Sequence, residues 1–293
     1  MIEVARPGAR NPAMEVVRPG ALTSVQDLGR GGLAHLGVPR SGALDEPAHR
    51  LANRLAGNPP AAATLETTLT GVALRARVDT VVVVTGAPAP VRVDGQPAAW
   101  GAAVRVPAGA LLDVGTATHG VRSYLAFAGG IDVPPVLGSR ATDLLSGLGP
   151  ARLSAGDVLP LGTPTGCPSF VDSAPTPAPP EVLVLRLVLG PRHGWFTGAA
   201  DALRQARYTV SPASNRIAVR TDGPPLTRAT DRELPSEGMV LGAVQVPADG
   251  RPMIFLADHP TTGGYPVVGV VPAPDLAAAA QARPGTPVRF IPS

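Results

Sequence analysis

Short apolar runs separated by turn residues dominate this chain. Each run is bounded by Gly, Pro or Asp, a pattern typical of strands in a barrel or sandwich. The runs predict a mainly β fold with strands at Val81–Thr85, Val91–Val93, Val104–Val106, Leu111–Val114, Tyr124–Ala128, Val182–Leu189, Ile217–Arg220, Met239–Val246, Met253–Ala257, Val267–Val271 and Pro287–Ile291.

Apolar residues recur at helical spacing in three places. The first is Leu44–Gly57, where Asp45 is placed to cap the helix and Gly57 to end it. Shorter helices are predicted at Gly198–Ala206 and at Leu276–Ala282. Three short helices are too few for a helical fold, so they leave the β prediction unchanged.

A Pro-rich stretch, DSAPTPAPP at residues 172–180, is the clearest linker in the chain. It divides a first part, residues 14–171, from a second part, residues 181–293, although strands on either side could share a barrel. We expect residues 1–13 to be an N-terminal extension, because EVARPGA at 3–9 recurs as EVVRPGA at 15–21. Chance similarity of two short segments is the alternative.

Composition excludes several classes of protein. The 293 residues include one Cys, Cys167, so neither an intrachain disulfide nor a Cys-based zinc site can form. The 25 basic residues are all Arg. Without Lys, a Schiff-base enzyme, a P-loop and a covalently bound biotin on this chain are excluded.

The charge and hydropathy patterns argue against nucleic-acid binding and against a membrane-spanning or secreted protein. Net charge is only +3, the Arg residues are scattered and aromatic residues make up 3%, so nucleic-acid binding is not expected. No apolar stretch reaches the roughly 18 residues of a membrane span. A secretory signal is also not supported, and we expect a cytoplasmic protein.

Polar residues gather in two segments of the first part. Gln26, Asp27 and Arg30 precede two glycines, which is typical of a loop that approaches a ligand. A polar turn in which Asp27 pairs with Arg30 explains the composition equally well. Ser41 and Asp45 lie at the start of the first helix, where Asp45 either caps the helix or shares its N-terminus with a bound anion.

The strongest local signal is the segment Asp258–Tyr265 in the second part. A predicted strand ends at Asp258, and the turn HPTTGGYP follows. A loop of this length is long for a hairpin turn, which favours binding. Its candidate binding residues provide hydroxyl groups, close backbone approach and a hydrogen-bonding ring: Thr261, Thr262, Gly263, Gly264 and Tyr265.

Eight ordered segments resemble the allophanate hydrolase subunit 2 family. That family includes the C subunit of 5-oxoprolinase, the sporulation-control protein KipA and the carboxyltransferase region of urea carboxylase. The match runs from about residue 15 to the end of the sequence, with departures at Arg40 and His259. The segments are Ser24–Arg30, Gly37–Asp45, Tyr124–Asp132, Val136–Asp143, Gly190–Phe196, Asn215–Leu226, Pro235–Pro247 and Asp258–Pro266.

The resemblance implies two cyclophilin-like β-barrel halves with the active site near their junction. It implies ATP-dependent conversion of 5-oxo-L-proline to L-glutamate, in a complex with the KipI-like B subunit plus the LamB/YcsF-like A subunit. ATP would bind in that complex at a site that the sequence does not locate. We expect loops from the front and the back of the chain, carrying Asp27 and Asp258, to converge on one pocket.

Candidate roles follow from that resemblance. Asp27, Glu237 and Asp258 are the predicted acid–base or orienting groups, and Thr261 and Thr262 the predicted oxyanion donors. Gln245 joins the binding residues. Arg140 is a candidate for the substrate carboxylate, since a planar guanidinium suits it; a surface ion pair with Asp143 is the alternative. No metal site is predicted, because the His residues lack HExxH spacing.

Two other functions remain open. One is a biotin-dependent carboxyltransferase or allophanate-hydrolase-type subunit of urea metabolism. The other is a KipA-like regulatory binding protein. The absence of a fused biotin carrier or second catalytic domain favours the oxoprolinase.

Overall fold

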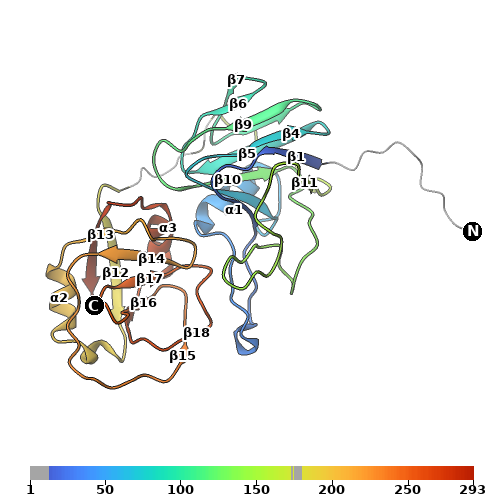
Figure 1. The fold of residues 1–293 in the computed structure, drawn as a ribbon. Helices are drawn as coiled ribbons and strands as arrows, with labels where there is room; N and C mark the ends of the chain where they lie inside the picture. The colour runs from blue at the N-terminus through green and yellow to red at the C-terminus, as the bar shows by residue number, and fades with distance from the viewer. Residues whose placement is uncertain (1–12, 173, 175–179) are drawn as a thin grey trace, which may run out of the picture.

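The computed structural model describes residues 13–172, 174 and 180–293. Strands predominate and three short α-helices accompany them, so the predicted mainly β fold is confirmed (Figure 1). Residues 1–12 of the predicted N-terminal extension, and residues 173 and 175–179 of the predicted linker, lie outside the described residues. The proposed division into two parts stays a prediction.

Two antiparallel sheets face each other in the first part of the chain. Their inner faces share one core, to which Met14 contributes from one sheet and Leu125 from the other. The six-stranded sheet has the order β11 (Val158–Pro160), β1 (Ala13–Arg18), β4 (Ala73–Ala76), β9 (Leu111–Val114), β6 (Val91–Val93) and β7 (Gln96–Ala98). The five-stranded sheet has the order β2 (Thr23–Gln26), β3 (Thr64–Thr68), β10 (Arg122–Phe127), β5 (Thr80–Gly86) and β8 (Ala103–Val106).

The second part closes into a barrel, at lower left in Figure 1. Strand β12 buries one face, because Leu183, Leu185 and Leu187 point inward while the residues between them are exposed. Strands β12 and β20 pair in parallel, and the other pairs are antiparallel. The barrel order is β12 (Leu183–Leu189), β19 (Val267–Val270), β16 (Ala243–Gln245), β17 (Met253–Phe255), β14 (Ala218–Asp222), β13 (Tyr208–Val210) and β20 (Pro287–Pro292).

The longest helix, α1 (Glu46–Leu55), covers the outer face of the five-stranded sheet. It packs on β5 and β10, where Val83, Tyr124 and Ala126 form a second cluster with helix residues. Both strands are therefore buried on two faces, which explains the continuous apolar run in β5. The carboxylate of Asp45 accepts from the Ala48 N–H at 3.1 Å, so the predicted N-cap is confirmed.

The remaining helical elements all lie near the predicted positions or in loops. Helix α2 (Ala199–Gln205) and helix α3 (Ala273–Gln281) belong to the second part. Two 3₁₀ turns, η1 (Ala34–Leu36) and η2 (His193–Trp195), interrupt loops. None of the helices in the described part of the chain has the length and apolar character needed to span a bilayer.

The strand predicted at Met239–Val246 is shorter than expected. Only Ala243–Gln245 pairs in the barrel, as β16. Gly242 breaks the strand, because its φ is 81° and a Cβ there would lie 2.3 Å from the Val271 carbonyl oxygen. Upstream of the break, Glu237–Gly238 forms a separate strand, β15, which pairs with β18 (Thr262–Gly263).

Gly129 lies close to the backbone of Gly162 in the first part, which gives a direct test of the packing there. Gly129 and Gly156 both have φ of 90°, but a Cβ on Gly129 would lie 2.0 Å from the Gly162 carbonyl oxygen. A Cβ on Gly156 meets nothing within 4 Å. We expect Gly129→Ala to lower the free energy of unfolding by roughly 2 kcal/mol or more beyond the backbone cost that both substitutions share. Urea unfolding of the two variants measures the difference; equal losses would contradict the packing.

Candidate functional site

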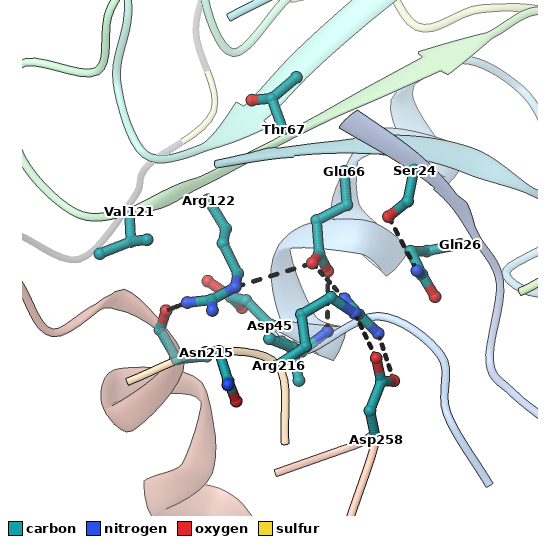
Figure 2. A network of polar contacts seen from close by, with 12 residues as sticks. Ser24, Gln26, Asp45, Glu66, Thr67, Val121, Arg122, Asn215, Arg216 and Asp258 are labelled. Atoms are coloured by element: carbon teal, nitrogen blue, oxygen red, sulfur yellow. Dashed lines mark hydrogen bonds and ion pairs between the residues drawn. The ribbon is translucent and has the colours of Figure 1, made fainter. Parts of the chain in front are cut away.

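A buried ion network joins the two parts of the chain, and Arg216 lies at its centre (Figure 2). The Arg216 side chain is 2% exposed. Its Nε and Nη2 donate to the two carboxylate oxygens of Asp258, each at 2.9 Å. Its Nη1 donates to Glu66, and Nη2 also donates to the Gly42 carbonyl at 2.7 Å. Arg216 thus pairs with one carboxylate from each part.

Glu66, on β3, is held ionised in the interior. Burial would raise its pKa, but the charges of Arg216 and Arg122 outweigh that effect and lower it. The Glu66 carboxylate also accepts from the Tyr124 hydroxyl at 2.7 Å and the Leu44 N–H at 3.0 Å. Burial and the neighbouring Glu66 raise the pKa of Tyr124, so its hydroxyl remains a donor.

Asp258 connects the network to the loops of the first part. It is fully buried and accepts from the Ser41 hydroxyl at 2.7 Å and from the Leu144 N–H at 3.3 Å. The Ser41 hydroxyl also lies 3.0 Å from the Thr142 carbonyl. Ser41 has a φ of 55°, a strained conformation that these contacts maintain.

Asp27 fixes the adjoining turn of the same loops. Its carboxylate accepts from the Ser139 hydroxyl and the Arg140 N–H, each at 2.6 Å, and from the Gly29 N–H at 2.8 Å. Through the 139–144 segment, the Asp27 loop and the Asp258 loop lie side by side. Their carboxylates are therefore engaged in positioning loops.

A cavity of about 90 Å³ lies beside these loops, between the two parts of the chain. It is lined by Arg40, Ser41 and Glu46 from the first part and by Leu241 and Leu256, among others, from the second. Asp27 and Asp258 are not among its lining residues. That both carboxylates line one shared pocket stays a prediction.

Two ion pairs considered from the sequence are wrong. Arg30 does not pair with Asp27 in the structure; its guanidinium donates to the carbonyls of Val136 and Ala141. The carboxylate of Asp27 instead accepts hydrogen bonds from the Ser139 hydroxyl and the Arg140 N–H.

The ion-pair partner of Arg140 also differs from Asp143, the partner considered from the sequence. Arg140 pairs with Asp132 at 2.8 Å and donates to the Val133 carbonyl at 2.7 Å. Asp143, the partner considered from the sequence, accepts from the Leu145 N–H and the Ser146 hydroxyl of its own turn. Asx-type turn bonds of this kind compete with distant charge pairs.

Asp45 has a second partner beyond the helix that it caps. Gln281, at the end of α3, donates to the other oxygen of Asp45 at 2.8 Å. Burial raises the pKa of Asp45, although these two hydrogen bonds act in the opposite direction. Gln281 also accepts from the Arg122 N–H, and the Ala280 carbonyl accepts from the Arg122 guanidinium, so the end of α3 docks on the first part through both residues.

The other predicted binding residues form an open surface on the second part. Thr262, Gly264 and Tyr265 are exposed on the β15–β18 pair and the turn that follows it. Gln245 lies buried beneath and donates to the Tyr265 carbonyl at 3.1 Å. A Cβ on Gly263 would lie 2.8 Å from the Gln245 amide nitrogen, so a larger residue there would displace the Gln245 side chain. Thr261 accepts from the Met239 N–H through its carbonyl, at 2.9 Å.

Glu237 lies at the edge of this surface, on β15. Its carboxylate is about one-third exposed and is paired with Arg192, which precedes η2. Arg192 was not predicted from the sequence, and neither were Arg216 and Glu66. A charged residue within the otherwise uncharged strand Thr64–Thr68 was the available signal for Glu66.

His259, where the sequence departs from the family, is buried beside Asp258. Its Nδ1 lies 2.7 Å from the Pro260 carbonyl, and burial lowers its pKa. In the part of the chain that the structure describes, no group of three or more His, Cys, Asp or Glu side chains is arranged to hold a metal ion.

Known proteins share this architecture over nearly the whole chain. The model of the family "carboxyltransferase domain, subdomain A and B" matches residues 36–292. The chain is 39% identical to the 5-oxoprolinase C subunit of Escherichia coli, covering 95% of this chain and 90% of that protein. It is 33% identical to urea amidolyase of Saccharomyces cerevisiae, covering 96% of this chain but 16% of that protein.

Solved structures of other proteins share this fold over nearly the whole chain. TTHA0988 superposes with a TM-score of 0.87 at 38% identity, covering 97% of this chain and 56% of that chain. The Kluyveromyces lactis urea amidolyase superposes with a TM-score of 0.89 at 32% identity, covering 98% of this chain and 19% of that chain. This chain thus corresponds to one segment of each of these longer proteins.

The buried network predicts a large stability difference between two arginines. Arg216→Met leaves Glu66 and Asp258 buried without their shared cation, which we expect to cost about 3–5 kcal/mol of unfolding free energy. Arg186→Met removes a cation from an ion pair with Asp275 in which the Arg186 side chain is 57% exposed, and the loss should be far smaller. Urea unfolding of both variants tests this, and similar losses would show that Arg216 does not hold the junction.

Proposed function

Because this chain belongs to the carboxyltransferase domain, subdomain A and B, family, we propose that it is the C subunit of an ATP-dependent 5-oxoprolinase. The observation that carries the proposal is the 39% identity to the Escherichia coli C subunit, which extends over 90% of that protein. The 5-oxoprolinase C subunit of Haemophilus influenzae is 34% identical over 87% of its length. The proposed reaction converts 5-oxo-L-proline to L-glutamate, with the A and B subunits as partners.

Lactam opening requires the loss of amide resonance, which explains the need for ATP. In the proposed reaction, the exposed β15–β18 surface faces the lactam or its phosphorylated form. The hydroxyls of Thr261 and Thr262 and nearby backbone N–H groups stabilise negative charge on the carbonyl oxygen as the C–N bond breaks. Gln245 supports this surface through its bond to the Tyr265 carbonyl.

The three candidate carboxylates take different roles in this proposal. Asp27 and Asp258 orient loops, since both are buried and their oxygens accept several hydrogen bonds. Glu237 is partly exposed and lies on the reacting surface, so it is the carboxylate placed to exchange a proton. ATP binding is assigned to the complex, since this chain has no Lys for a P-loop.

Similarity to urea amidolyase supports a second candidate function. The chain matches that protein over 96% of its own length at 33% identity, and the fold is shared. In that case the same surface would receive carboxybiotin from a separate carrier and urea as acceptor.

Reconstitution with candidate partners distinguishes the two functions. We expect the mixture of this chain with the A and B subunits to release glutamate from 5-oxoproline only when ATP is present and only when this chain is included. Glutamate release is measured by an enzyme-coupled assay. Full activity without this chain would reject the proposal, and urea-dependent ATP turnover with a biotin carboxylase and carrier would favour the second function.

A pair of threonines tests the proposed oxyanion surface. We expect Thr262→Val to lower kcat of the reconstituted complex by about 100-fold, because it removes a hydroxyl while conserving shape. Thr209→Val is the matched control, since Thr209 is also an exposed threonine on a strand, but on β13. Steady-state kinetics of both complexes measure the effect; an unchanged kcat in Thr262→Val would remove this residue from the mechanism.

A further inference from the structure

The segment Gly190–Phe196 brings a guanidinium to the edge of the exposed β15–β18 surface. Arg192 donates to the carboxylate of Glu237, whose backbone pairs with Gly263 in the two-stranded sheet. The Arg192 guanidinium carbon lies 5.2 Å from the centre of the Trp195 ring. Arg192 is thus held against an aromatic face next to the strand that carries Thr262.

A neighbouring arginine shows what is particular to Arg192. Arg228 contacts the same ring, with its guanidinium carbon 5.6 Å from the Trp195 ring centre. Its Nε donates to the Thr230 carbonyl at 3.2 Å and its Nη2 to the Arg232 carbonyl at 2.8 Å. Arg228 therefore fixes its own loop and has no carboxylate partner among the described residues.

Arg192 differs in both respects. Its partner is a side-chain carboxylate, and both members of the pair are about one-third exposed. Its Nε has no hydrogen-bond partner within the described ranges. A guanidinium in this setting can exchange one carboxylate for another without moving the backbone, because an incoming carboxylate offers the same two acceptor oxygens.

We propose that Arg192 binds the carboxylate of the lactam substrate and that Glu237 is the counter-ion it replaces. This inference rests on the proposed function, in which the substrate carries one carboxylate. Trp195 lies against the Arg192 guanidinium and limits its orientations. The pairing of β15 with β18 places the lactam ring on the side of Thr262, the proposed oxyanion donor.

The exchange also gives Glu237 its second role. While it is paired with Arg192, the Glu237 carboxylate has one oxygen occupied by the guanidinium. Once the substrate carboxylate takes that cation, Glu237 is free to accept a proton at the same surface. Arg140, the candidate from the sequence, lies in the first part of the chain and pairs with Asp132. Its Nε donates to the Val133 carbonyl, whereas the Nε of Arg192 has no such partner within the described residues.

The test compares two lactams that differ by the carboxylate. We expect Arg192→Gln in the reconstituted complex to raise KM for 5-oxoproline roughly 10- to 100-fold, since one charged hydrogen-bonding partner is lost. Turnover of 2-pyrrolidinone, the same ring without the carboxylate, should remain as in the wild-type complex. Arg192→Lys keeps the charge without the planar fork, so its KM for 5-oxoproline should lie between those of the wild type and Arg192→Gln. Arg228→Gln is the matched control and should leave KM unchanged.

The outcomes separate this inference from the proposed function. If the wild-type complex releases no glutamate from 5-oxoproline, the proposed function fails and the role of Arg192 fails with it. If the wild-type complex is active and Arg192→Gln keeps the wild-type KM, only the role of Arg192 is overturned. A loss of kcat alone, or a KM increase shared equally by Arg228→Gln, would also overturn it, because either result indicates a structural effect.

Discussion

A buried arginine with one carboxylate partner on each side is the constraint on which this structure depends. Removing Arg216, Glu66 and Asp258 from water is costly, and the cost is offset only if all three meet in good geometry. Because Glu66 comes from β3 and Asp258 from the end of the β17 segment, that geometry exists only when the sheets of the first part and the barrel of the second part are correctly docked. The ion pairs of the network therefore form in one relative position of the two parts.

The contacts at this junction position the loops of the candidate site. Asp258 holds Ser41 and the 142–144 turn, and the chain continues directly from Asp258 into the exposed Thr261–Tyr265 segment. The polar residues of these loops thus form two layers. The inner carboxylates, Asp27 and Asp258, are buried and position loops, whereas Thr262 and Glu237 lie at the exposed β15–β18 surface.

Strands and helix caps, which depend on neighbouring residues, could be predicted from the sequence, whereas ion pairs between distant residues could not. Strand runs such as Leu111–Val114 and the Asp45 cap depend on neighbours within a few residues, and both are confirmed. The alternatives Asp27–Arg30 and Arg140–Asp143, which rest on proximity in sequence, are wrong, because turn backbone binds Asp27 and Asp132 pairs with Arg140. Arg216 and Glu66 are 150 residues apart, so no local pattern links them. The family resemblance placed both loops near a junction, but the roles of their residues remain predictions.

The order in which the barrel strands join has a consequence for synthesis of the protein. Strand β12 begins the barrel and pairs in parallel with β20, which is also bonded to β13. The ring therefore stays open until β20 has been translated, and the apolar inner faces of β12 and β14 are uncovered until then. Ribosome stalling or truncation before Pro287 would release a chain whose first sheets are complete but whose second half presents unpaired edges, a form expected to need chaperones or to aggregate.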